Sequence, residues 1–454
     1  MPLPPFFFFC LRWSAPGRFL SPFASFFLPL GPRSVRMERL EIPELTPPPP
    51  TFEALLAPIT PLLTEMAPAI DAQAQSRKLF FADFVRLLLF ALVLRIPSLR
   101  QLVTELETSP TAASLNLPTM PLSTLKDGFI RFPVTAFARL FHHLVQTASW
   151  LEVEEIKALG PLCLVDGSLF RVLVRMSWAV YKKGKNALRL HLALDLNHLI
   201  PVEFAIGAGT SSERAFLRSI IQAGITYVAD RGYFAFDLFN HIHCAQAYFV
   251  MRAKENLQYT ISQCLPLTGT FSVRWEKVSD QDVLLSNDPF QHPYRLVTFS
   301  VLGKPFLILT NRFDLTTFQV ILVYAYRWQV ELIFRFLKQG LQGTHLFSQS
   351  AQGSQVFFYL LLITALLQLQ LKQNCAIQAA EETPGEAPKE RGPDADDTPP
   401  SDDTAQAPYS FLAAIGGKLK IYWKIGCHWL RRLQNLLAKP FDPSIIRALS
   451  YDQQ

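Results

Sequence analysis

The hydrophobic pattern of the chain changes from helical to strand-like at residues 161–173, PLCLVDGSLFRVL. The runs WAVYKK (178–183) and ALRLHLALDL (187–196) follow, separated by the turn-prone GKN, and LIPVEFAIG (199–207) continues them. Short apolar runs bounded by Gly, Pro and Asn are typical of strands. We therefore expect three sequential strands of one sheet, with the fourth run extending it.

Helical and strand-like runs alternate after these strands. The next two are SERAFLRSIIQA (212–223), a helix opened by a Ser cap, and ITYVAD (225–230), a short buried strand. A second helix, FAFDLFNHIHCAQ (234–246), and a further strand, AYFVMRAK (247–254), come after them. Three meandering strands followed by helix–strand crossovers are the order of a ribonuclease-H-like α/β domain.

The charge of the chain is unevenly distributed. Residues 381–403 carry nine acidic and two basic residues, a net charge of −7, so the remainder of this +6 chain carries +13. A basic body suits a polyanionic partner such as nucleic acid. The six cysteines include no CxxC pair, which argues against a disulfide framework or a thiolate zinc site and is typical of a reducing cytosol.

Composition and pattern divide the chain into five segments. Three β-type runs between Glu255 and Arg312 predict an inserted β-subdomain. The helical module that precedes the sheet either docks on DNA or packs on the next domain as a scaffold. We predict a disordered Phe- and Pro-rich leader and spacer (1–54), a helical DNA-binding domain (55–155), a ribonuclease-H-like domain (156–372) with the β-insertion at about 255–315, an acidic disordered linker (373–408) and a basic helical tail (409–454).

No membrane segment is expected. The apolar run Val356–Leu367 is too short to cross a bilayer and is predicted as a core helix. The leader lacks a signal-peptide cleavage site, and MERLEIPEL reads as an ordinary start, so translation is expected to begin at Met37. A zinc site needs four ligands, so His241, His243 and Cys244 are expected to lie along a helix without binding metal.

Two aspartates lie at predicted strand ends. Asp166 follows the apolar LCLV, and Asp230 ends the strand ITYVA. In an open sheet, polar groups at the carboxyl ends of strands face the crevice where ligands bind. A single aspartate at such a place is more often a turn or cap residue, so neither indicates a site by itself.

A third carboxylate lies in an apolar helical stretch, YAYRWQVELIFRFLK (324–338). In a regular helix, Tyr324, Arg327, Glu331 and Lys338 fall within roughly 60° on one face. The simpler interpretation is a salt-bridged helix face, because Glu331 has an i,i+4 basic partner.

Three carboxylates at these places favour a metal site over that salt bridge. Asp166 and Asp230 on strands and Glu331 on a crossing helix offer oxygen donors for Mg²⁺ or Mn²⁺, with two ions expected. Such a pair of ions suits in-line attack at a phosphodiester. The sequence therefore predicts phosphoryl-transfer chemistry on nucleic acid.

These blocks resemble a known family. VDGS (165–168), ADRGYF (229–234) and the spacing YxxRxxxExxxxxxK are similar to the three blocks of DDE transposases from bacterial insertion sequences. The nearest resemblance is to the YREK-signature type, insertion-sequence family four. It covers roughly residues 55–370 and includes LHLALDL, SSERAFL, FVMRAK and LTNRFDL. The leader, the acidic segment and the tail are not part of it.

The resemblance implies roles for single residues. Asp166, Asp230 and Glu331 would form the catalytic metal triad. Tyr324, Arg327 and Lys338 would bind DNA phosphates. An arginine fork and a lysine point charge both match phosphate oxygens.

Further residues are expected near the DNA. Arg231 is expected to bind phosphate because it adjoins Asp230. Trp328 has two open interpretations, a core aromatic or a platform for an unpaired base. A basic cluster near the predicted hairpin either contacts the DNA backbone or is a solvated turn: Lys182, Lys183, Lys185 and Arg189.

The implied function is DNA transposition. The protein would bind the terminal inverted repeats of its insertion sequence, form a homodimer, and cleave and transfer strands by a cut-and-paste route. The expected partner is double-stranded DNA of element ends and target, and the expected location is the bacterial cytoplasm at the nucleoid. Two alternatives stay open, a ribonuclease-H-like nuclease without transposition and a catalytically silent DNA-binding repressor derived from a transposase.

Overall fold

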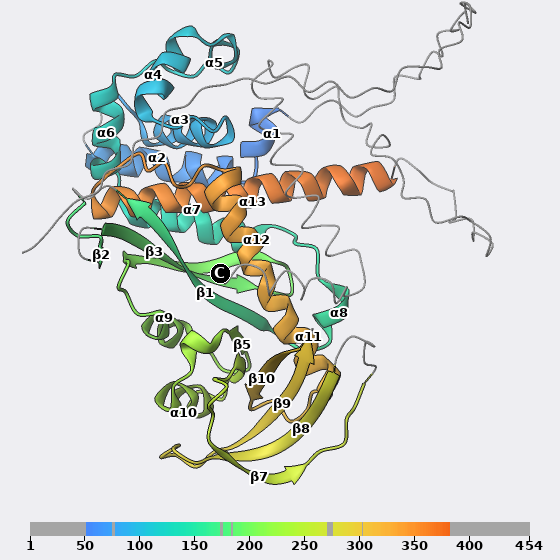
Figure 1. Cartoon of the computed structure of the whole chain (residues 1–454). Coiled ribbons are helices and arrows are strands. Elements are labelled where there is room, and N and C mark those ends of the chain that lie inside the picture. Colours follow the sequence, from blue (N-terminus) through green and yellow to red (C-terminus); the bar gives the residue numbers. More distant parts are fainter. Residues whose placement is uncertain are drawn as a thin grey trace, which may run out of the picture. The chain divides into compact units, whose positions relative to one another are not determined.

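The computed structural model describes residues 51–74, 78–172, 176–182, 185–269, 276–301 and 303–381 (Figure 1). All of them belong to one compact unit, Pro47–Gln454. The predicted start at Met37, nearly all of the leader, the linker beyond residue 381 and the basic tail lie outside the described residues.

The N-terminal part is helical, as predicted. Its central helix, α3, is buried along most of its length, because the sequence FADFVRLLLFALV has few polar residues. Ser98 caps the next helix by accepting a 3.2 Å hydrogen bond from the backbone N–H of Gln101. The helices are α1 (Phe52–Leu56), α2 (Thr60–Ala74), α3 (Phe81–Val93), α4 (Leu99–Thr108), α5 (Pro110–Ser114), α6 (Leu122–Arg131) and α7 (Val134–Thr147).

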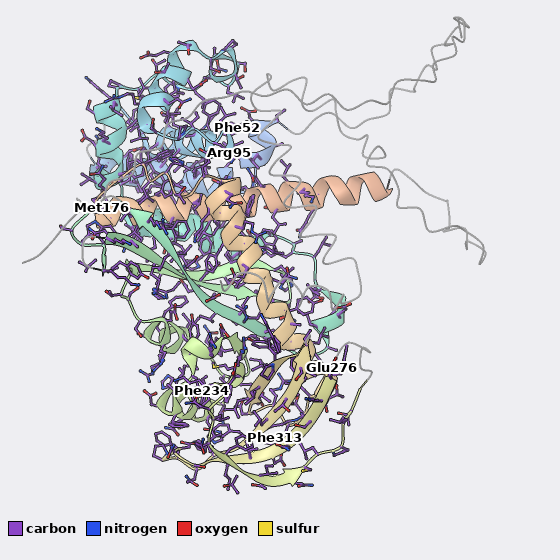
Figure 2. All side chains as sticks on the ribbon, in the orientation of Figure 1. Phe52, Arg95, Met176, Phe234, Glu276 and Phe313 are labelled. Carbon is purple, nitrogen blue, oxygen red and sulfur yellow. The ribbon has the colours of Figure 1, made fainter. Side chains whose placement is uncertain are left out.

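These helices share one hydrophobic core with the rest of the described chain. Phe84 packs edge-on against Phe129 and Phe137, with ring centroids 5.2 and 6.2 Å away. Helix α13 (Ala351–Glu381) packs against α3, α7 and strand β4. Side chains fill the space between the N-terminal helices and the sheet (Figure 2). This is the arrangement that a scaffold role predicts, and a DNA-docking role for residues 55–155 stays a prediction.

Helix α13 is longer than the predicted core helix. It begins at Ala351 and continues through Glu381, into the segment expected as linker. Within the described residues, Ala351–Asn374 is the one stretch long and apolar enough to cross a membrane by length and composition. Most of its apolar window, 83%, is buried inside the protein, as in the core helix of a globular domain.

The central sheet forms in the predicted order. Strands β1, β5 and β6 are parallel neighbours, and β3 pairs antiparallel with β1. Helices α9 and α10 connect them in the expected crossovers. The elements are α8 (Glu154–Lys157), β1 (Leu162–Val172), β2 (Val180–Lys182), β3 (Lys185–Asp195), β4 (Ile200–Ala208), α9 (Glu213–Ile220), β5 (Thr226–Ala229), α10 (Phe236–Cys244) and β6 (Tyr248–Arg252). This mixed α/β arrangement is consistent with the predicted ribonuclease-H-like class.

The strands of the predicted β-insertion continue the central sheet. In the described residues, ten strands form one sheet in the order β2-β3-β1-β5-β6-β10-β9-β8-β7, with β4 beside β3. The later strands therefore extend the central sheet, because β10 pairs antiparallel with β6 and covers its edge. These strands are β7 (Tyr259–Cys264), β8 (Glu276–Leu285), β9 (Pro293–Val301) and β10 (Lys304–Thr310).

A buried ion pair anchors the helix that follows these strands. Arg295 on β9 donates to both carboxylate oxygens of Asp280 on β8, at 2.9 and 2.6 Å, and the Asp280 side chain is fully buried. The hydroxyl of Thr317, the first residue of α11 (Thr317–Ala325), donates to the same carboxylate at 2.6 Å. Thr316 and Gln319 form a capping box at this helix start. The sheet therefore fixes where α11 begins.

Candidate active site

Asp166 belongs to β1, and Asp230 directly follows β5, the parallel neighbour of β1. Leu164 of β1 is in register with Val228 of β5, and each aspartate lies two residues beyond its member of that pair. Asp230 follows the last residue of β5, as predicted. The prediction that Asp166 ends its strand is wrong, because β1 continues to pair with β3 beyond Asp166, as far as Val172.

The predicted third element brings its polar residues to these aspartates. The hydroxyl of Tyr324 donates to Asp230 Oδ1 at 3.3 Å. A guanidinium nitrogen of Arg327 lies 3.7 Å from Asp166 Oδ2. Farther along, Lys338 Nζ donates to Ser168 Oγ on β1 at 2.7 Å. The structure thus places this face of the segment against Asp166 in β1 and Asp230 after β5.

The segment is not the regular α-helix that the periodicity predicted. Helix α11 ends at Ala325, a 3₁₀ turn covers Tyr326–Trp328, and α12 (Gln329–Arg335) runs into a π turn at Phe336–Gly340. A 3₁₀ turn overwinds a helix and a π turn holds an extra residue, and both are frequent at functional sites. The Trp328 side chain lies outside the described part, so its two interpretations stay open.

Glu331 lies in the first turn of α12 and acts electrostatically on the same group of residues. Its charge raises the pKa of Asp166 and also raises the pKa of Arg327. It opposes the effect of burial, which lowers the pKa of Lys338. Glu331 therefore lies within electrostatic range of Asp166, Arg327 and Lys338.

Burial is the main cause of the unusual pKa of Asp166. It raises that pKa to about 7, against the opposing effects of the Arg327 charge and of a 2.7 Å hydrogen bond from the Gly167 N–H. The Arg327 pKa is raised by Tyr324, Asp230, Asp166 and Glu331 together, although its own burial opposes this. A cation placed among these acids stabilises their charged forms.

The donor chemistry of the site fits a divalent cation. Asp166, Asp230 and Glu331 offer the carboxylate oxygens that Mg²⁺ and Mn²⁺ prefer, and the Arg327 guanidinium lies among them as a positive charge. Within the described residues, no three His, Cys, Asp or Glu side chains lie close enough to share an ion. The three carboxylates would have to close around an ion to hold it jointly. His241, His243 and Cys244 lie along helix α10, as expected.

Two basic residues of the predicted site differ in environment. Arg231 is exposed in the 3₁₀ turn after Asp230, where phosphate could reach it, and its role stays a prediction. Arg189 is not a free cation of the hairpin. It is paired with Glu213 and donates twice to the Gly209 carbonyl, at 3.2 and 3.1 Å.

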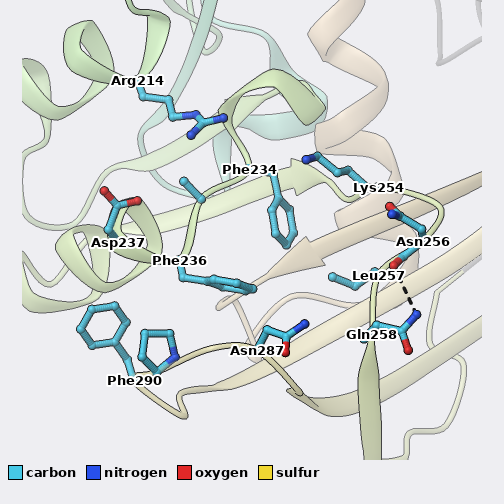
Figure 3. A pocket seen from close by; sticks show the side chains of 12 residues that line it. Arg214, Phe234, Phe236, Asp237, Lys254, Asn256, Leu257, Gln258, Asn287 and Phe290 are labelled. Atoms are coloured by element: carbon cyan, nitrogen blue, oxygen red, sulfur yellow. Dashed lines mark hydrogen bonds between the residues drawn. The ribbon is translucent and has the colours of Figure 1, made fainter.

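A pocket of about 640 Å³ opens beside the turn that follows Asp230 (Figure 3). Its lining includes Phe234, Phe236 and Phe290, with Arg214 and Lys254 supplying positive charge. None of the seven predicted site residues lines it.

Glu213 was not among the predicted site residues. It occurs in SSERAFL, and an acid in the first turn of a helix has an ordinary explanation in the helix dipole. No local signal in the sequence indicates its position, because only the fold brings Glu213 to Gly167 and Gly232.

The buried His191 on β3 is expected to make the free energy of unfolding depend on pH in the acid range. It is 3% exposed, its Nε2 lies 2.8 Å from Ser211 Oγ, and its ring stacks on Phe216. Burial, and then the charge of Arg189, lower the pKa of His191 from 6.5 to about 4. The unfolded chain takes up this proton near pH 6.5 and the folded chain does not until about pH 4. The free energy of unfolding should therefore fall by on the order of 2 kcal/mol between pH 7 and pH 5 from this residue.

Urea unfolding of the wild type and of His191→Asn at these two pH values measures that effect. We expect the variant to lose less stability than the wild type on acidification. Equal losses in the two proteins would contradict the assignment.

Comparison with known proteins agrees with this geometry. Residues 157–367 match the transposase DDE domain family. A Sinorhizobium fredii protein whose name describes it as a transposase is 25% identical over 256 residues, which are 55% of this chain and 71% of that protein. A Geobacillus stearothermophilus protein named as a transposase for insertion sequence element IS5377 is 24% identical over 247 residues, 53% of this chain and 65% of that protein.

These matches support a transposase, the class of enzyme that cleaves and transfers DNA. The matched region begins just before β1 and ends within α13, so it contains both aspartates and the whole segment from Tyr324 to Lys338. More particularly, they support a transposase of the DDE class. These matches indicate a protein of the transposition of insertion sequences.

Proposed function

We propose that this chain is a DNA transposase of the YREK type that cleaves and transfers DNA strands at the ends of its insertion sequence. The observation that carries the proposal is the placement of Tyr324, Arg327 and Lys338 against β1 and against the aspartates on β1 and β5. Charged side chains with these contacts on a largely buried helix suit an anionic substrate and a metal better than a salt bridge alone.

The proposed catalytic residues are Asp166, Asp230 and Glu331, which would hold two Mg²⁺ or Mn²⁺ ions. The chemistry that such ions supply when bound is an activated water nucleophile and stabilisation of the leaving oxygen. The chain itself contributes the enclosure. Burial of Asp166 excludes water from one side of the site, and the hydroxyl of Tyr324 orients the Asp230 carboxylate.

The proposed DNA contacts follow from the chemistry of the side chains. Arg327 is a planar fork suited to two phosphate oxygens, and Lys338 supplies a point charge beside β1. Arg231 would bind phosphate from the exposed turn after Asp230. We further propose that the ends are paired in a homodimer, that the route is cut-and-paste, and that the protein acts in the bacterial cytoplasm at the nucleoid.

A joining assay tests this function. The purified chain is given Mg²⁺, a plasmid and a duplex that carries the inverted repeat flanking its gene, either intact or already cleaved. We expect nicking of the intact end and a covalent joint between the cleaved end and the plasmid. Cutting without joining would overturn the proposal in favour of a nuclease, and DNA retardation without cutting would overturn it in favour of a repressor.

A further inference from the structure

The carboxylate of Glu213 lies over two glycines, one beside each predicted catalytic aspartate. A Cβ atom added to Gly167, next to Asp166, would lie 2.9 Å from Glu213 Oε1. One added to Gly232, two residues after Asp230, would lie 3.3 Å from Oε2. Both separations are shorter than ordinary van der Waals contact, so the absence of side chains at these two positions makes room for this carboxylate.

Arg189 on β3 holds Glu213 in this place. Its guanidinium pairs with Glu213 Oε1, and its remaining nitrogens donate to the Gly209 carbonyl at 3.2 and 3.1 Å. The two side chains are 20% and 24% exposed, so the pair is held in a partly dry environment where charge acts strongly. The start of α9 is also fixed, because Ser212 caps it.

The buried hydroxyl of Tyr233 points to the same cluster. Tyr233 is 1% exposed, and its hydroxyl has no hydrogen-bond partner among the described residues. After burial, the charges that act on its pKa are those of Asp166, Glu213, Arg189 and Asp230. A buried hydroxyl without a protein partner among three acids is a position that a water molecule or a bound ion would satisfy.

We infer that Glu213, held by Arg189, is a positioning residue that sets the spacing and charge of Asp166 and Asp230 for a divalent cation. The inference rests on the proposed metal-dependent function and deepens it. Glu213, held in place by Arg189, bridges the strand of Asp166 and the turn after Asp230 and so sets the spacing of the two aspartates. Residues that act through the ligands of a metal usually change metal affinity or activity 10- to 100-fold when replaced.

The test compares Glu213→Gln with Arg218→Gln. Glu213→Gln keeps the size of the side chain and removes its charge and ion pair. Arg218→Gln removes another ion pair of α9, to Asp237, away from the aspartates. Arg189→Gln is a second test variant that leaves the Glu213 charge in place without its partner.

Two titrations with Mn²⁺ are measured on each protein. The first follows the melting temperature without DNA, because a ligand that binds only the folded state raises it. The second follows cleavage of an element end. In Glu213→Gln and Arg189→Gln we expect about 10- to 100-fold more Mn²⁺ to be needed in both titrations, with metal-free DNA retardation unchanged. In Arg218→Gln we expect the wild-type midpoints.

Each outcome separates the inference from the function on which it rests. A wild type that shows neither Mn²⁺-dependent stabilisation nor cleavage would overturn the proposed function. A wild type that shows both, with unchanged Mn²⁺ midpoints in Glu213→Gln, would overturn the positioning role. Lower metal-free stability in both test variants at unchanged midpoints would also overturn it, because that is the mark of a purely structural ion pair.

Discussion

Replacement of Asp166 by Asn is expected to lower Mg²⁺-dependent strand cleavage roughly 10⁴-fold, as does removal of one member of a catalytic group that acts as a unit. The asparagine keeps the size of the side chain and can accept the 2.7 Å hydrogen bond from the Gly167 N–H. It removes one of three carboxylates proposed to hold metal. Asp230→Asn and Glu331→Gln are expected to have effects of the same order.

The measurement is a single-turnover cleavage assay on an element end, with DNA retardation measured alongside. Retardation should be largely intact, because these residues are proposed to bind metal and not phosphate. Asp195→Asn is the matched control. Asp195 ends strand β3 of the same sheet and bonds to His198 at 2.7 Å, apart from the proposed triad. Full cleavage by any of the three variants would refute the triad.

Asp166→Asn should not lose activity through unfolding. The pKa of Asp166 in the folded protein is about 7, above its ordinary value of 3.8. Between these two pH values the folded state holds a proton that the unfolded chain has released, so the metal-free wild type loses stability as pH rises from about 4 to 7. A neutral asparagine removes that loss. The melting temperature of metal-free Asp166→Asn at pH 8 is therefore expected to equal or exceed that of the wild type.

The second large effect is expected at the buried ion pair of the extended sheet. Arg295→Met should lower the free energy of unfolding by about 3–5 kcal/mol, because it leaves the Asp280 carboxylate buried without its partner. It also leaves the carbonyls of Arg312 and Leu315 without the guanidinium that they accept from. Urea unfolding followed by circular dichroism measures the loss.

An exposed ion pair gives the comparison. Arg139 and Glu65 pair at 2.9 Å with side chains 56% and 65% exposed, and Arg139→Met should cost less than about 1 kcal/mol. The double variant Asp280→Leu/Arg295→Met should recover much of the stability, since it removes both charges. A loss at Arg295→Met as small as that at Arg139→Met would contradict the burial argument.

The sequence predicted the local structure. It also predicted that VDGS, ADRGYF and the segment from Tyr324 to Lys338 come together in the fold. Alternation and turn residues predicted the strands around Asp166 and Asp230, and the structure shows that these strands are parallel neighbours. Polar spacing in an apolar helix predicted that Tyr324, Arg327 and Lys338 share a face, and their contacts agree. The strands and the shared helix face were predicted from patterns within short stretches of the chain, whereas the meeting of the blocks was predicted from the order of the elements and from the family resemblance.

The sequence did not predict which strands pair with each other when they lie far apart along the chain. The run that became β10 has the pattern of a strand, but nothing within it specifies pairing with β6, more than fifty residues earlier. The non-α turns at Tyr326–Trp328 and Phe336–Gly340 were missed because a fixed angle per residue cannot express them. The contact of Glu213 with Arg189 depends on α9 packing across β1, which is a tertiary event.

The common core of the N-terminal helices and the sheet has a consequence for the evolution of the protein. A DNA-binding module on a flexible tether can be exchanged between proteins with little loss to either part. Here Phe84, Phe137 and the inner face of α13 belong to one packed cluster with residues of α11 and α12. Exchange of the helical part alone would open cavities along α13, at several kcal/mol for each large side chain lost. The helices of residues 52–147 and the catalytic segment are therefore expected to diverge together, as one lineage.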